Sequence, residues 1–358
     1  MRRILFFADA SSVHTQRWVR EMATRGFDCV VATRRPADVP GASDVVPIRP
    51  GGDAAGWWLA LGQVRRVARR LSPQWVHGHY VTSYGLWAGS AGRALGRPVV
   101  LSAWGSDILV TPREPGWRGL AMAGLVGRTL RRADLVTADA ADVLDEIRRY
   151  GATRCEEVLW GADTERFVPG EPAPGFEIAS LRAWEPNYNI DTLLRAFAAL
   201  RAERPEAPAV LHMLGGGPGE PALRAEAAAL AIEGDVRFTG RVDDAAMVTT
   251  LQRCRVSVSV PSSDATSVSV LESMSCGLPV VASDLPANRR WIEPALLVPP
   301  RDAGALAAAL SRLAGDAQRA RSLGQRNRAL VLEHASRRAQ MDRMASLYDD
   351  VLARHRRP

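Results

Sequence analysis

Two acidic residues, Asp264 and Glu272, lie eight positions apart around the expected start of a short helix. The stretch SSDATSVSVLESMSCGLPVVASD, residues 262–284, predicts a polar loop, a helix over 268–276 and then a buried strand, with Gly277 as the helix C-cap. The apolar run RVSVSVP before the loop predicts another strand. Ligands of such β-α-β units lie beyond the carboxyl ends of the strands. We therefore expect a binding site at this loop and helix start.

The expected helix start has the chemistry of an anion site. Free backbone N–H groups and the positive end of the helix dipole favour a phosphate there. The small side chains of Ser267 and Ser269 leave the amides of Ser267 and Val268 accessible. Helical side chains lean toward the N-terminus, which brings the Glu272 carboxylate toward the loop of Asp264. A phosphate beside two hydroxyl-binding carboxylates suits a sugar nucleotide. The alternative is that Asp264 caps the helix and Glu272 is a solvated surface charge.

The elements that must position this site are short apolar strands that alternate with amphipathic helices. Strands are expected at 3–9, 28–34, 75–80, 98–104, 134–139, 176–182, 235–242, 255–261 and 279–283, and within 207–219. Such alternation is typical of parallel sheets that helices cover on both faces. Residues 157–175 are rich in Gly and Pro and are expected to link two domains, and residues 303–357 are expected to be helical. The predicted fold class is α/β, with two doubly wound domains in series.

Length and charge narrow the classes of function. A chain of 358 residues is longer than one core usually serves, so two domains are expected. The formal net charge is +7, and all 46 basic residues are arginine. A basic balance suggests an acidic partner, such as a nucleotide, a phospholipid surface or nucleic acid, although surface solubility explains it equally well. Because the arginines are spread over many helices, nucleic acid is not expected as a partner.

The cysteines and the N-terminus indicate the compartment. None of the four cysteines belongs to a C-x-x-C pair, so neither zinc nor a disulfide framework is expected. Buried thiols fit a reducing cytosol, which makes a cytoplasmic location the expectation. The apolar run after the first residues is too short for a signal peptide, and no apolar stretch is long enough to span a bilayer.

Six segments together resemble a known family. Asp264, Ala265, Thr266, Ser267, Val268 and Glu272, followed by CGLPVVASD, resemble the E-x7-E signature of family 4 retaining glycosyltransferases of GT-B fold (glycosyl transferases group 1), with Asp264 in place of the first Glu. The other similar segments, in the family's order, are SVHTQRWVREMATRGFDCVV, VHGHYVTSYG with LSAWGSDIL, VLWGADTERFVPG, HMLGGGPG and FTGRVDD. The resemblance implies two Rossmann-like domains that face each other across a cleft. These are an acceptor-binding domain at 1–163 and a nucleotide-sugar-binding domain at 164–340, with a helix at 341–358 that returns to the first domain.

The resemblance also implies roles for the residues around the helix start. Glu272 would bind the ribose hydroxyls of the donor nucleotide. Asp264 would contact the transferred sugar, and Arg182 in SLRAWEP would bind the pyrophosphate, so both are candidate catalytic residues. Thr266, Ser267 and Val268 would lie beside the sugar or the pyrophosphate.

Further donor-binding residues follow from the same resemblance. Arg241 and Val242 would lie by the base, and Gly215 and Gly216 would form a tight turn at the cleft wall, for which a simple β-turn is the alternative. Asn187 stands where the family often has a lysine, so one positive charge near the diphosphate is missing or comes from another arginine. In the first loop, Ser11 and Ser12 replace paired glycines, and we include Ser12 among the donor-binding candidates.

On the acceptor side, His79 and Asp107 are the candidate catalytic residues, because each lies at the C-terminal end of an expected strand, where the cleft should be. Trp104 is either a stacking platform for a sugar or part of the core. A lone histidine is more often structural than catalytic, which applies to His14, His77 and His79. We find no D-x-D pair, and the resemblance implies an enzyme that works without a metal or other cofactor.

The expected function is therefore retaining transfer of a sugar, of hexosyl or N-acetylhexosaminyl type, from a nucleotide-diphosphate donor to a hydroxyl, with a UDP-sugar favoured. The alternative is a non-catalytic sugar-nucleotide-binding or regulatory protein of the same fold. The acceptor stays open among small molecules, lipid-linked sugars and polysaccharides. The basic helices GQVRRVARRL and GRTLRRA allow peripheral contact with the inner face of an anionic membrane, although a solvated helix face is favoured.

Overall fold

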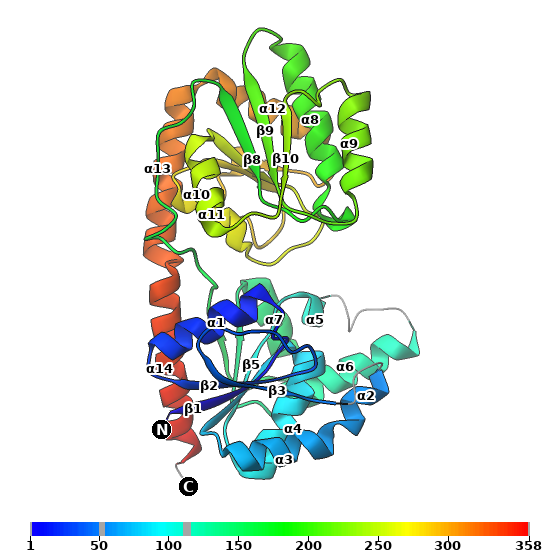
Figure 1. Cartoon of the computed structure of the whole chain (residues 1–358), viewed down its shortest axis with the longest axis vertical. Coiled ribbons are helices and arrows are strands. Elements are labelled where there is room, and N and C mark those ends of the chain that lie inside the picture. Colours follow the sequence, from blue (N-terminus) through cyan, green and yellow to red (C-terminus); the bar gives the residue numbers. More distant parts are fainter. Residues whose placement is uncertain (1, 50–53, 110–115, 357–358) are drawn as a thin grey trace. The chain divides into compact units, whose positions relative to one another are not determined.

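The computed structural model describes residues 2–49, 54–109 and 116–356. The chain divides into two compact units. Unit 1 comprises Met1–Leu159 and Ala339–Pro358, and unit 2 comprises Trp160–Arg338. Each unit is built around its own parallel sheet (Figure 1). The divisions at 159/160 and 338/339 lie close to the expected ones at 163/164 and 340/341.

Unit 1 contains a seven-stranded sheet in the order β3-β2-β1-β4-β5-β6-β7, with every neighbouring pair parallel. Its strands are β1 (Arg3–Phe7), β2 (Asp28–Thr33), β3 (Ala42–Pro47), β4 (Trp75–His79), β5 (Val99–Ser102), β6 (Leu135–Ala138) and β7 (Cys155–Glu157). Its helices are α1 (Val13–Thr24), α2 (Ala54–Leu59), α3 (Leu61–Leu71), α4 (Gly85–Leu95), α5 (Ser106–Leu109), α6 (Trp117–Leu130) and α7 (Ala141–Arg149), with a π-helical turn at Tyr80–Tyr84. The strand order reverses at β1, which lies between β2 and β4, so the two strand ends that flank this switch point can hold a ligand.

Unit 2 contains a six-stranded parallel sheet in the order β10-β9-β8-β11-β12-β13. Its strands are β8 (Phe176–Ser180), β9 (Ala209–Leu214), β10 (Val236–Gly240), β11 (Val256–Ser259), β12 (Val280–Ser283) and β13 (Leu297–Val298). Its helices are α8 (Ile190–Glu203), α9 (Glu220–Ala229), α10 (Asp244–Arg253), α11 (Val268–Ser275), α12 (Ala303–Gly315) and α13 (Ala317–His334). Here the order reverses between β8 and β11, where Ile178 pairs with Val256 and Ala179 with Ser257. The α/β prediction is therefore confirmed for both units.

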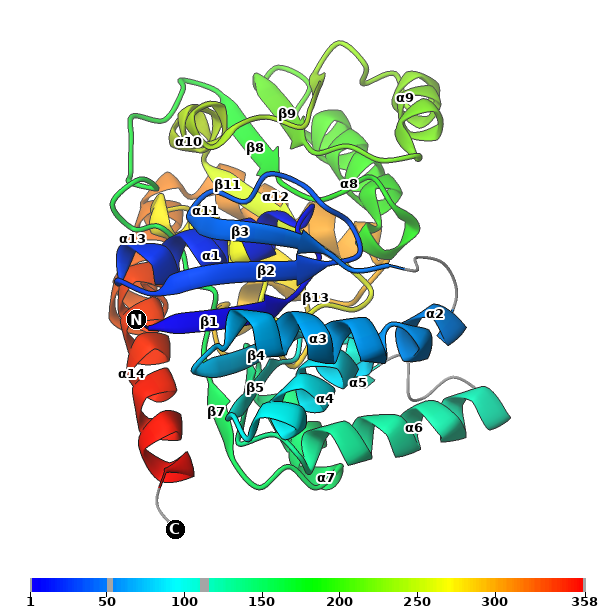
Figure 2. The same ribbon diagram turned by 60° about the horizontal axis from the view of Figure 1, so that its bottom comes forward.

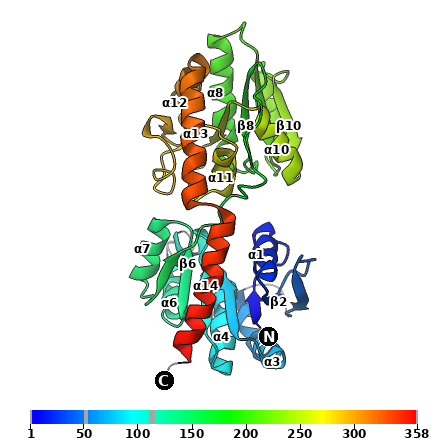
Figure 3. The same ribbon diagram turned by 90° about the vertical axis from the view of Figure 1, so that its left-hand side faces the viewer.

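The last helix, α14 (Arg337–His355), packs from Ala339 onward with unit 1 (Figure 3). Tyr348 is fully buried, its carbonyl accepts a hydrogen bond from Trp75 Nε1 at 2.6 Å, and its hydroxyl lies 2.5 Å from His77 Nδ1. Ion pairs from Arg2 to Asp349 and from Arg154 to Asp350 add contacts at the helix surface. The C-terminal helix thus completes the core of unit 1.

Three short strands were not expected from the sequence. β3 is a partly exposed edge strand, β7 is three half-buried residues, and β13 has only two residues. Runs this short, or this polar, carry too little apolar periodicity to be recognised. The linker expected at 157–175 therefore overlaps β7 by one residue, because Glu157 is the last residue of that strand.

The two chain segments at the edge of unit 2 run side by side. Ala162 forms a parallel bridge with Ser336, and the amide of Ala162 donates to the Ala335 carbonyl at 2.9 Å. Gly161 has a φ of 66°, and a Cβ there would lie 2.6 Å from the Ala335 carbonyl oxygen. Only glycine fits this backbone conformation and this close approach without strain.

Candidate active site

In unit 2, Arg182 and Asp264 meet at the switch point of the sheet. Arg182 follows β8, and Asp264 lies in the loop after β11, so both stand at the carboxyl ends of neighbouring strands. The Arg182 guanidinium donates to Asp264 Oδ2 at 2.6 Å, to Ser269 Oγ at 3.3 Å and to Ser267 Oγ. It also lies over the ring of Tyr188, 4.4 Å from the ring centroid. The predicted cation and the predicted loop carboxylate therefore form one cluster.

Arg182 is held almost out of solvent. The residue is 8% exposed, and its Nε is buried without a hydrogen-bond partner among the described residues. Asp264 neutralises the charge, but burial raises the pKa of its carboxyl above the usual range, although the Arg182 charge opposes that shift. A buried arginine with a single carboxylate partner and an unsatisfied donor is a suitable site for an added anion.

The glycine-rich turn after β9 fixes the backbone beside this arginine. A Cβ on Gly215 would lie 2.1 Å from the carbonyl oxygen of Arg182, and a Cβ on Gly217 would lie 2.6 Å from that of Trp184. The amide of Trp184 donates to the Gly216 carbonyl at 3.1 Å. The turn is therefore more than a simple β-turn, because its glycines allow two backbones to approach each other behind Arg182.

Two asparagines fasten the loop that carries Asp264. The side-chain amide of Asn187 donates to the Ser263 carbonyl at 2.9 Å, and the Asn187 carbonyl accepts from the Ser262 amide at 2.8 Å. The buried Asn189 adopts a φ of 48°, and its amide donates to the Val260 carbonyl at 2.8 Å and to Ser262 Oγ at 3.0 Å. Asn187, predicted to bind the donor, thus shapes the loop and supplies no charge in place of the lysine.

Asn189 and Tyr188 were not predicted from the sequence as residues of this site. A signal for Asn189 was present, because asparagine before a helix is one of the residues that tolerate a left-handed backbone. Nothing in the sequence indicated that the Tyr188 ring would lie against Arg182.

The start of α11 keeps the arrangement expected for an anion site. Ser267 is the N-cap residue with an extended backbone, and its side chain makes no capping hydrogen bond because Arg182 occupies it. Thr266 and Ser267 are each 8% exposed, and Val268 begins the helix. Asp264 does not cap the helix, because its other oxygen accepts from the neighbouring Ala265 amide at 3.1 Å. The structure thus contradicts the capping alternative.

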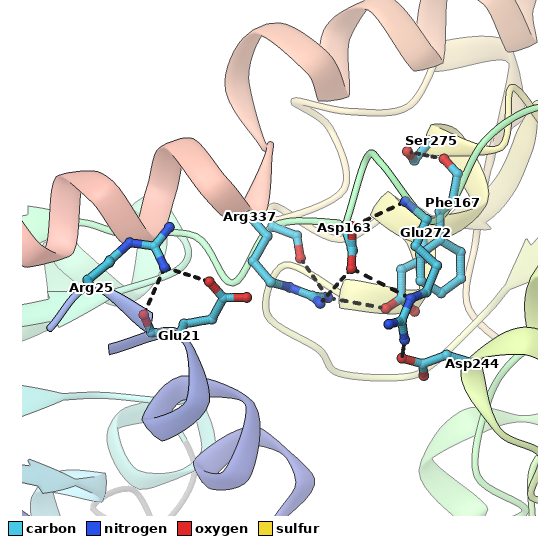
Figure 4. Close-up of polar contacts among 10 residues, drawn as sticks. Glu21, Arg25, Asp163, Phe167, Asp244, Glu272, Ser275 and Arg337 are labelled. Atoms are coloured by element: carbon cyan, nitrogen blue, oxygen red, sulfur yellow. Dashed lines mark hydrogen bonds and ion pairs between the residues drawn. The ribbon is translucent and has the colours of Figure 1, made fainter. Parts of the chain in front are cut away.

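Glu272 has a different environment from the one expected. It is 3% exposed, so it is not a solvated surface charge, and its carboxylate lies 3.5 Å from Arg337 Nη2 (Figure 4). Arg337 is also buried and lies 3.9 Å from Asp163. Each of the two acids thus has its own arginine, Arg182 for Asp264 and Arg337 for Glu272.

Two further predicted donor-binding residues, Arg241 and Val242, lie in the segment that directly follows β10. Arg241 is exposed and forms no ion pair with a described residue, and Val242 is half-buried. A Cβ on Gly216 would lie 3.3 Å from the Arg241 side chain, so the glycine turn and Arg241 are neighbours. These contacts place Arg241 next to the segment that supports Arg182.

In unit 1, His79 is fully buried at the end of β4. Its Nδ1 lies 3.3 Å from Thr15 Oγ1, and its ring packs against Phe6, Trp18 and Trp104. Burial lowers its pKa to about 3, so the ring is neutral at physiological pH. A side chain that is 0% exposed does not face an open acceptor site, which corrects the sequence-based expectation.

Asp107 organises the loop after β5. It is 3% exposed, and its two carboxylate oxygens accept hydrogen bonds from the amides of Val81 at 2.7 Å and Trp104 at 3.0 Å. Burial raises its pKa despite these bonds. Tyr80 stacks on Trp104 with centroids 5.4 Å apart. Asp107 thus positions a Tyr80–Trp104 pair, and it does not present a free carboxylate. Trp104 keeps partial exposure, so a role as a stacking platform stays open.

The first loop of unit 1 places Ser12 at the helix start that follows β1. Ser12 is the N-cap residue of α1 with an extended backbone, is half-buried and makes no side-chain capping bond. Its amide donates to the Asp9 carbonyl at 3.1 Å. The Ser12 hydroxyl is therefore not committed to capping α1.

Among the described residues, one cluster has the side chains that could bind a metal ion. The potential ligand atoms of Glu177, His212 and Cys254 all lie within 4.8 Å of one another. Glu177 is already ion-paired with Arg253 at 2.9 Å and hydrogen-bonded to His212 at 2.8 Å. Desolvation by burial raises the pKa of Glu177, but the hydrogen bonds and charges of Arg253 and His212 outweigh it and lower the pKa below its usual value. The group is therefore an ion-pair centre between β8, β9 and α10.

Comparison with known proteins identifies the family. The profile of the family described as Glycosyl transferase 4-like matches residues 3–140, and that of Glycosyl transferases group 1 matches residues 177–316. The chain belongs to the group 1 glycosyltransferases of family 4. The two matches cover the sheets of both units, and the resemblance seen in the sequence is confirmed.

A curated relative of this chain is the MMP α-(1→4)-mannosyltransferase of Mycolicibacterium hassiacum. It is 27% identical over 229 residues, which cover 62% of this chain and 55% of that protein. The chain therefore spans about half the length of this relative.

Two solved structures share the GT-B fold. The sucrose-phosphate synthase of Thermosynechococcus elongatus has a TM-score of 0.81 at 20% identity, covering 99% of this chain and 100% of that one. HepE of Anabaena in complex with UDP has a TM-score of 0.80 at 16% identity, covering 98% and 100%. None of the helices within the described residues is long and apolar enough to cross a membrane.

Proposed function

We propose that this chain transfers a sugar from a nucleotide-diphosphate donor to an acceptor hydroxyl, with retention of the anomeric configuration. The observation that carries the proposal is the buried Arg182 beside Asp264 and the start of α11. This cluster offers a cation, hydroxyls and helix N–H groups at the point where ligands of doubly wound sheets bind.

The charge that develops during transfer fits these groups. Glycosyl transfer passes through an oxocarbenium-like state, and negative charge grows on the departing diphosphate. Arg182 and the amides at the start of α11 would stabilise that charge, because they are already oriented before the donor binds. Asp264 would then lie beside the transferred sugar and accept hydrogen bonds from its hydroxyl groups. The leaving phosphate itself would take the acceptor proton, so the burial of His79 and Asp107 leaves the scheme intact.

A UDP-sugar of hexosyl or N-acetylhexosaminyl type is our favoured donor. HepE, which shares the fold, binds UDP, whereas the curated relative is a mannosyltransferase. The transferred sugar and the base are therefore the finer points that need a direct test. The buried thiols Cys29 and Cys254 are consistent with our cytoplasmic assignment, because such compartments keep thiols reduced.

A screen of product nucleotides tests the donor. The full chain is titrated with UDP, GDP, ADP and TDP while its unfolding temperature is followed, because a ligand that binds only the folded state stabilises it. We expect UDP to raise the unfolding temperature most. A larger rise in unfolding temperature with another nucleotide would mean that the donor carries that nucleotide instead of UDP. If none of the four raised the unfolding temperature, the proposed donor site at Arg182 would be wrong.

One observation favours a non-catalytic sugar-nucleotide-binding protein as the second candidate. Asn187 stands where the family often has a lysine, and its side chain binds the loop instead, so it adds no positive charge to the site. Release of nucleotide from a radiolabelled UDP-sugar, in the presence and absence of acceptor alcohols, distinguishes the two. Binding without any release would favour the second candidate.

A further inference from the structure

Three helices of unit 1, α3, α4 and α6, carry basic side chains and no acidic ones, and α2 beside them carries no charged side chain. Residues 54–106 and 116–133, which contain α2, α3, α4 and α6, include no Asp or Glu. The arginines in these stretches are Arg65, Arg66, Arg69, Arg70, Arg93, Arg97, Arg118, Arg128, Arg131 and Arg132. Along the sequence these arginines are spread over several helices, but the fold gathers the helices on one side of the unit 1 sheet (Figure 2). We call the exposed side chains of α2, α3, α4, α6 and the Arg131–Arg132 turn the basic face.

A groove between α3, α4 and α6 lies at the centre of the basic face. Its volume is about 380 Å³, and its polar lining consists of Arg65, Arg93, Arg128, Arg132, Ser90 and Thr129. No described residue that lines the groove is acidic. Four guanidinium groups and two hydroxyls around one hollow form a site for a phosphate group, which arginine binds through two parallel hydrogen bonds.

The positive charge of the groove is not neutralised within the protein. Arg93, Arg128 and Arg132 form no ion pair with any residue in the described ranges, and Arg65 donates to Ser90 Oγ at 2.9 Å. Burial and the charges of Arg128, Arg93 and Arg131 lower the pKa of Arg132. Exposed arginines on other helices do have acidic neighbours, as in the pairs of Arg148 with Asp145 and Arg354 with Asp350. The charge of the basic face is therefore a local feature and not the general pattern of this arginine-rich chain.

Large apolar side chains stand beside these arginines. Six large apolar residues are exposed among those described, and four of them lie on α2 and α6. Their exposed fractions are 53% for Trp58, 72% for Leu59, 75% for Trp117 and 78% for Leu120. Trp58 also lines the groove together with Leu125 of α6, so the apolar and basic side chains adjoin. A merely solvated helix face does not account for this exposed tryptophan and leucine.

We propose that the basic face binds the surface of a bilayer that contains anionic phospholipids. The groove takes a lipid phosphate, and Trp58, Leu59 and Leu120 enter the boundary between headgroups and acyl chains. Basic side chains are attracted to the negative surface potential of such a membrane, and apolar side chains add burial that free phosphate does not provide. The inference does not depend on the sugar-transfer proposal, because it concerns a different surface of unit 1.

Sedimentation with vesicles tests the proposal on the full chain. Vesicles of phosphatidylcholine alone are compared with vesicles that also contain phosphatidylglycerol, at low and at physiological salt. We expect binding to the anionic vesicles, with partition at least about tenfold weaker on the neutral ones, and a decrease with salt because the charges are exposed. Binding to the anionic vesicles that equals binding to the neutral ones would overturn the proposal.

Two pairs of substitutions separate the two contributions. Arg128→Gln with Arg132→Gln should weaken partition on the order of tenfold, and Leu59→Ser with Leu120→Ser should weaken it at least about fivefold. Matched controls remove the same charge or the same kind of side chain from α13, as Arg319→Gln with Arg321→Gln and as Leu332→Ser. All variants must keep the wild-type unfolding temperature, which is expected because the substituted side chains are exposed.

Four outcomes would contradict the proposal. Equal weakening by the α13 controls would mean that net charge, and not the basic face, binds the vesicles. The basic face would also be ruled out as the binding surface if neither Arg128→Gln with Arg132→Gln nor Leu59→Ser with Leu120→Ser weakened binding to the vesicles. If sedimentation showed a dimer that Leu59→Ser with Leu120→Ser dissociates while vesicle binding persists, the apolar side chains would belong to an interface between two copies. If inorganic phosphate abolished binding to the vesicles, the groove would be a site for free phosphate and not for a lipid headgroup.

Discussion

At the scale of single residues, the site depends on how little freedom Arg182 has. Asp264, Ser267, Ser269 and the Tyr188 ring hold its guanidinium before any ligand is bound. An oriented cation stabilises a developing charge without reorganising first, which is the main source of electrostatic catalysis. The role of Arg182 therefore requires the planar fork of arginine as well as its charge.

Replacing Arg182 by lysine tests that requirement. A lysine keeps the charge but cannot reach Asp264 and the two serine hydroxyls with one fork, so we expect kcat to fall about 10²–10³-fold. The measurement is steady-state release of nucleotide from the donor that the nucleotide screen selects. Arg166→Lys is the control, because Arg166 pairs with Asp244 in an exposed ion pair. An unchanged kcat would mean that another cation stabilises the leaving diphosphate.

Glu272→Gln tests the predicted contact with ribose. Losing a charge-assisted hydrogen bond should weaken UDP about tenfold or more, while binding of 2′,3′-dideoxy-UDP should change little. Arg337→Gln is the companion variant, because it removes the ion-pair partner of Glu272 but no predicted ligand contact. Both variants should lose stability, on the order of 3–5 kcal/mol, because each leaves the other member of a buried ion pair without its partner. If Glu272→Gln weakens both nucleotides equally, the carboxylate supports the fold of the site and does not bind ribose.

His79 makes the stability of unit 1 dependent on pH. Its native pKa of about 3 lies below the ordinary value of 6.5, so in this interval the proton binds only to the unfolded chain. Stability is therefore present above 6.5 and falls as the pH drops toward 3. Between about pH 7.5 and about pH 5, His79 should account for a loss of about 2 kcal/mol. Urea denaturation of His79→Gln should therefore show a decrease in the free energy of unfolding over this pH range that is smaller than in the wild type by this amount. An equal loss in both proteins would contradict the burial of a neutral ring.

At the scale of elements, the site depends on where strands end and on how closely turns approach them. β8 and β11 are neighbours in the sheet, so the residues after them meet although they are far apart in sequence. The glycine turn after β9 then supports the segment of Arg182 from behind. Backbone contacts of this kind tolerate no added side chain.

Gly215→Ala tests the close approach. The new Cβ would lie 2.1 Å from the Arg182 carbonyl oxygen, so the two segments must separate. We expect the free energy of unfolding to fall by about 1–3 kcal/mol and nucleotide binding to weaken with it. Gly234→Ala is the matched control, because no atom lies within 4 Å of its Cβ position. If the two variants behaved alike in urea denaturation and in nucleotide titration, the turn would be flexible enough to yield.

At the scale of the whole molecule, the chain returns to its first unit at the end. α14 supplies Met341, Met344, Tyr348 and Val351 to the core of unit 1, all of them buried. A unit whose core includes residues from both ends of the chain cannot complete its folding until the C-terminus is present. The strands at 3–7 and 75–79 therefore depend on residues that follow unit 2 in the sequence.

Tyr348→Phe measures this dependence without deleting the helix. The substitution removes the hydroxyl 2.5 Å from His77 Nδ1 and leaves that nitrogen buried. We expect the free energy of unfolding of unit 1 to fall by about 1–3 kcal/mol, the usual cost of an unsatisfied buried group. Tyr150→Phe serves as the control at a half-buried position. Equal stability of Tyr348→Phe and the wild type in urea denaturation would show that the hydroxyl bond is weak.

The sequence by itself determined the α/β class and the two parallel sheets, which follow from local patterns because alternation of strands and helices imposes parallel pairing. The family resemblance, and not a local pattern, predicted that Arg182 and Asp264 serve one donor site, and the structure shows that the two side chains meet at the carboxyl ends of neighbouring strands. Only the tertiary structure decided that Glu272 pairs with Arg337, that His79 is buried and that arginines from three helices surround one groove. Burial and long-range partners depend on which faces pack together, and that information lies in the assembled fold and not in any single segment.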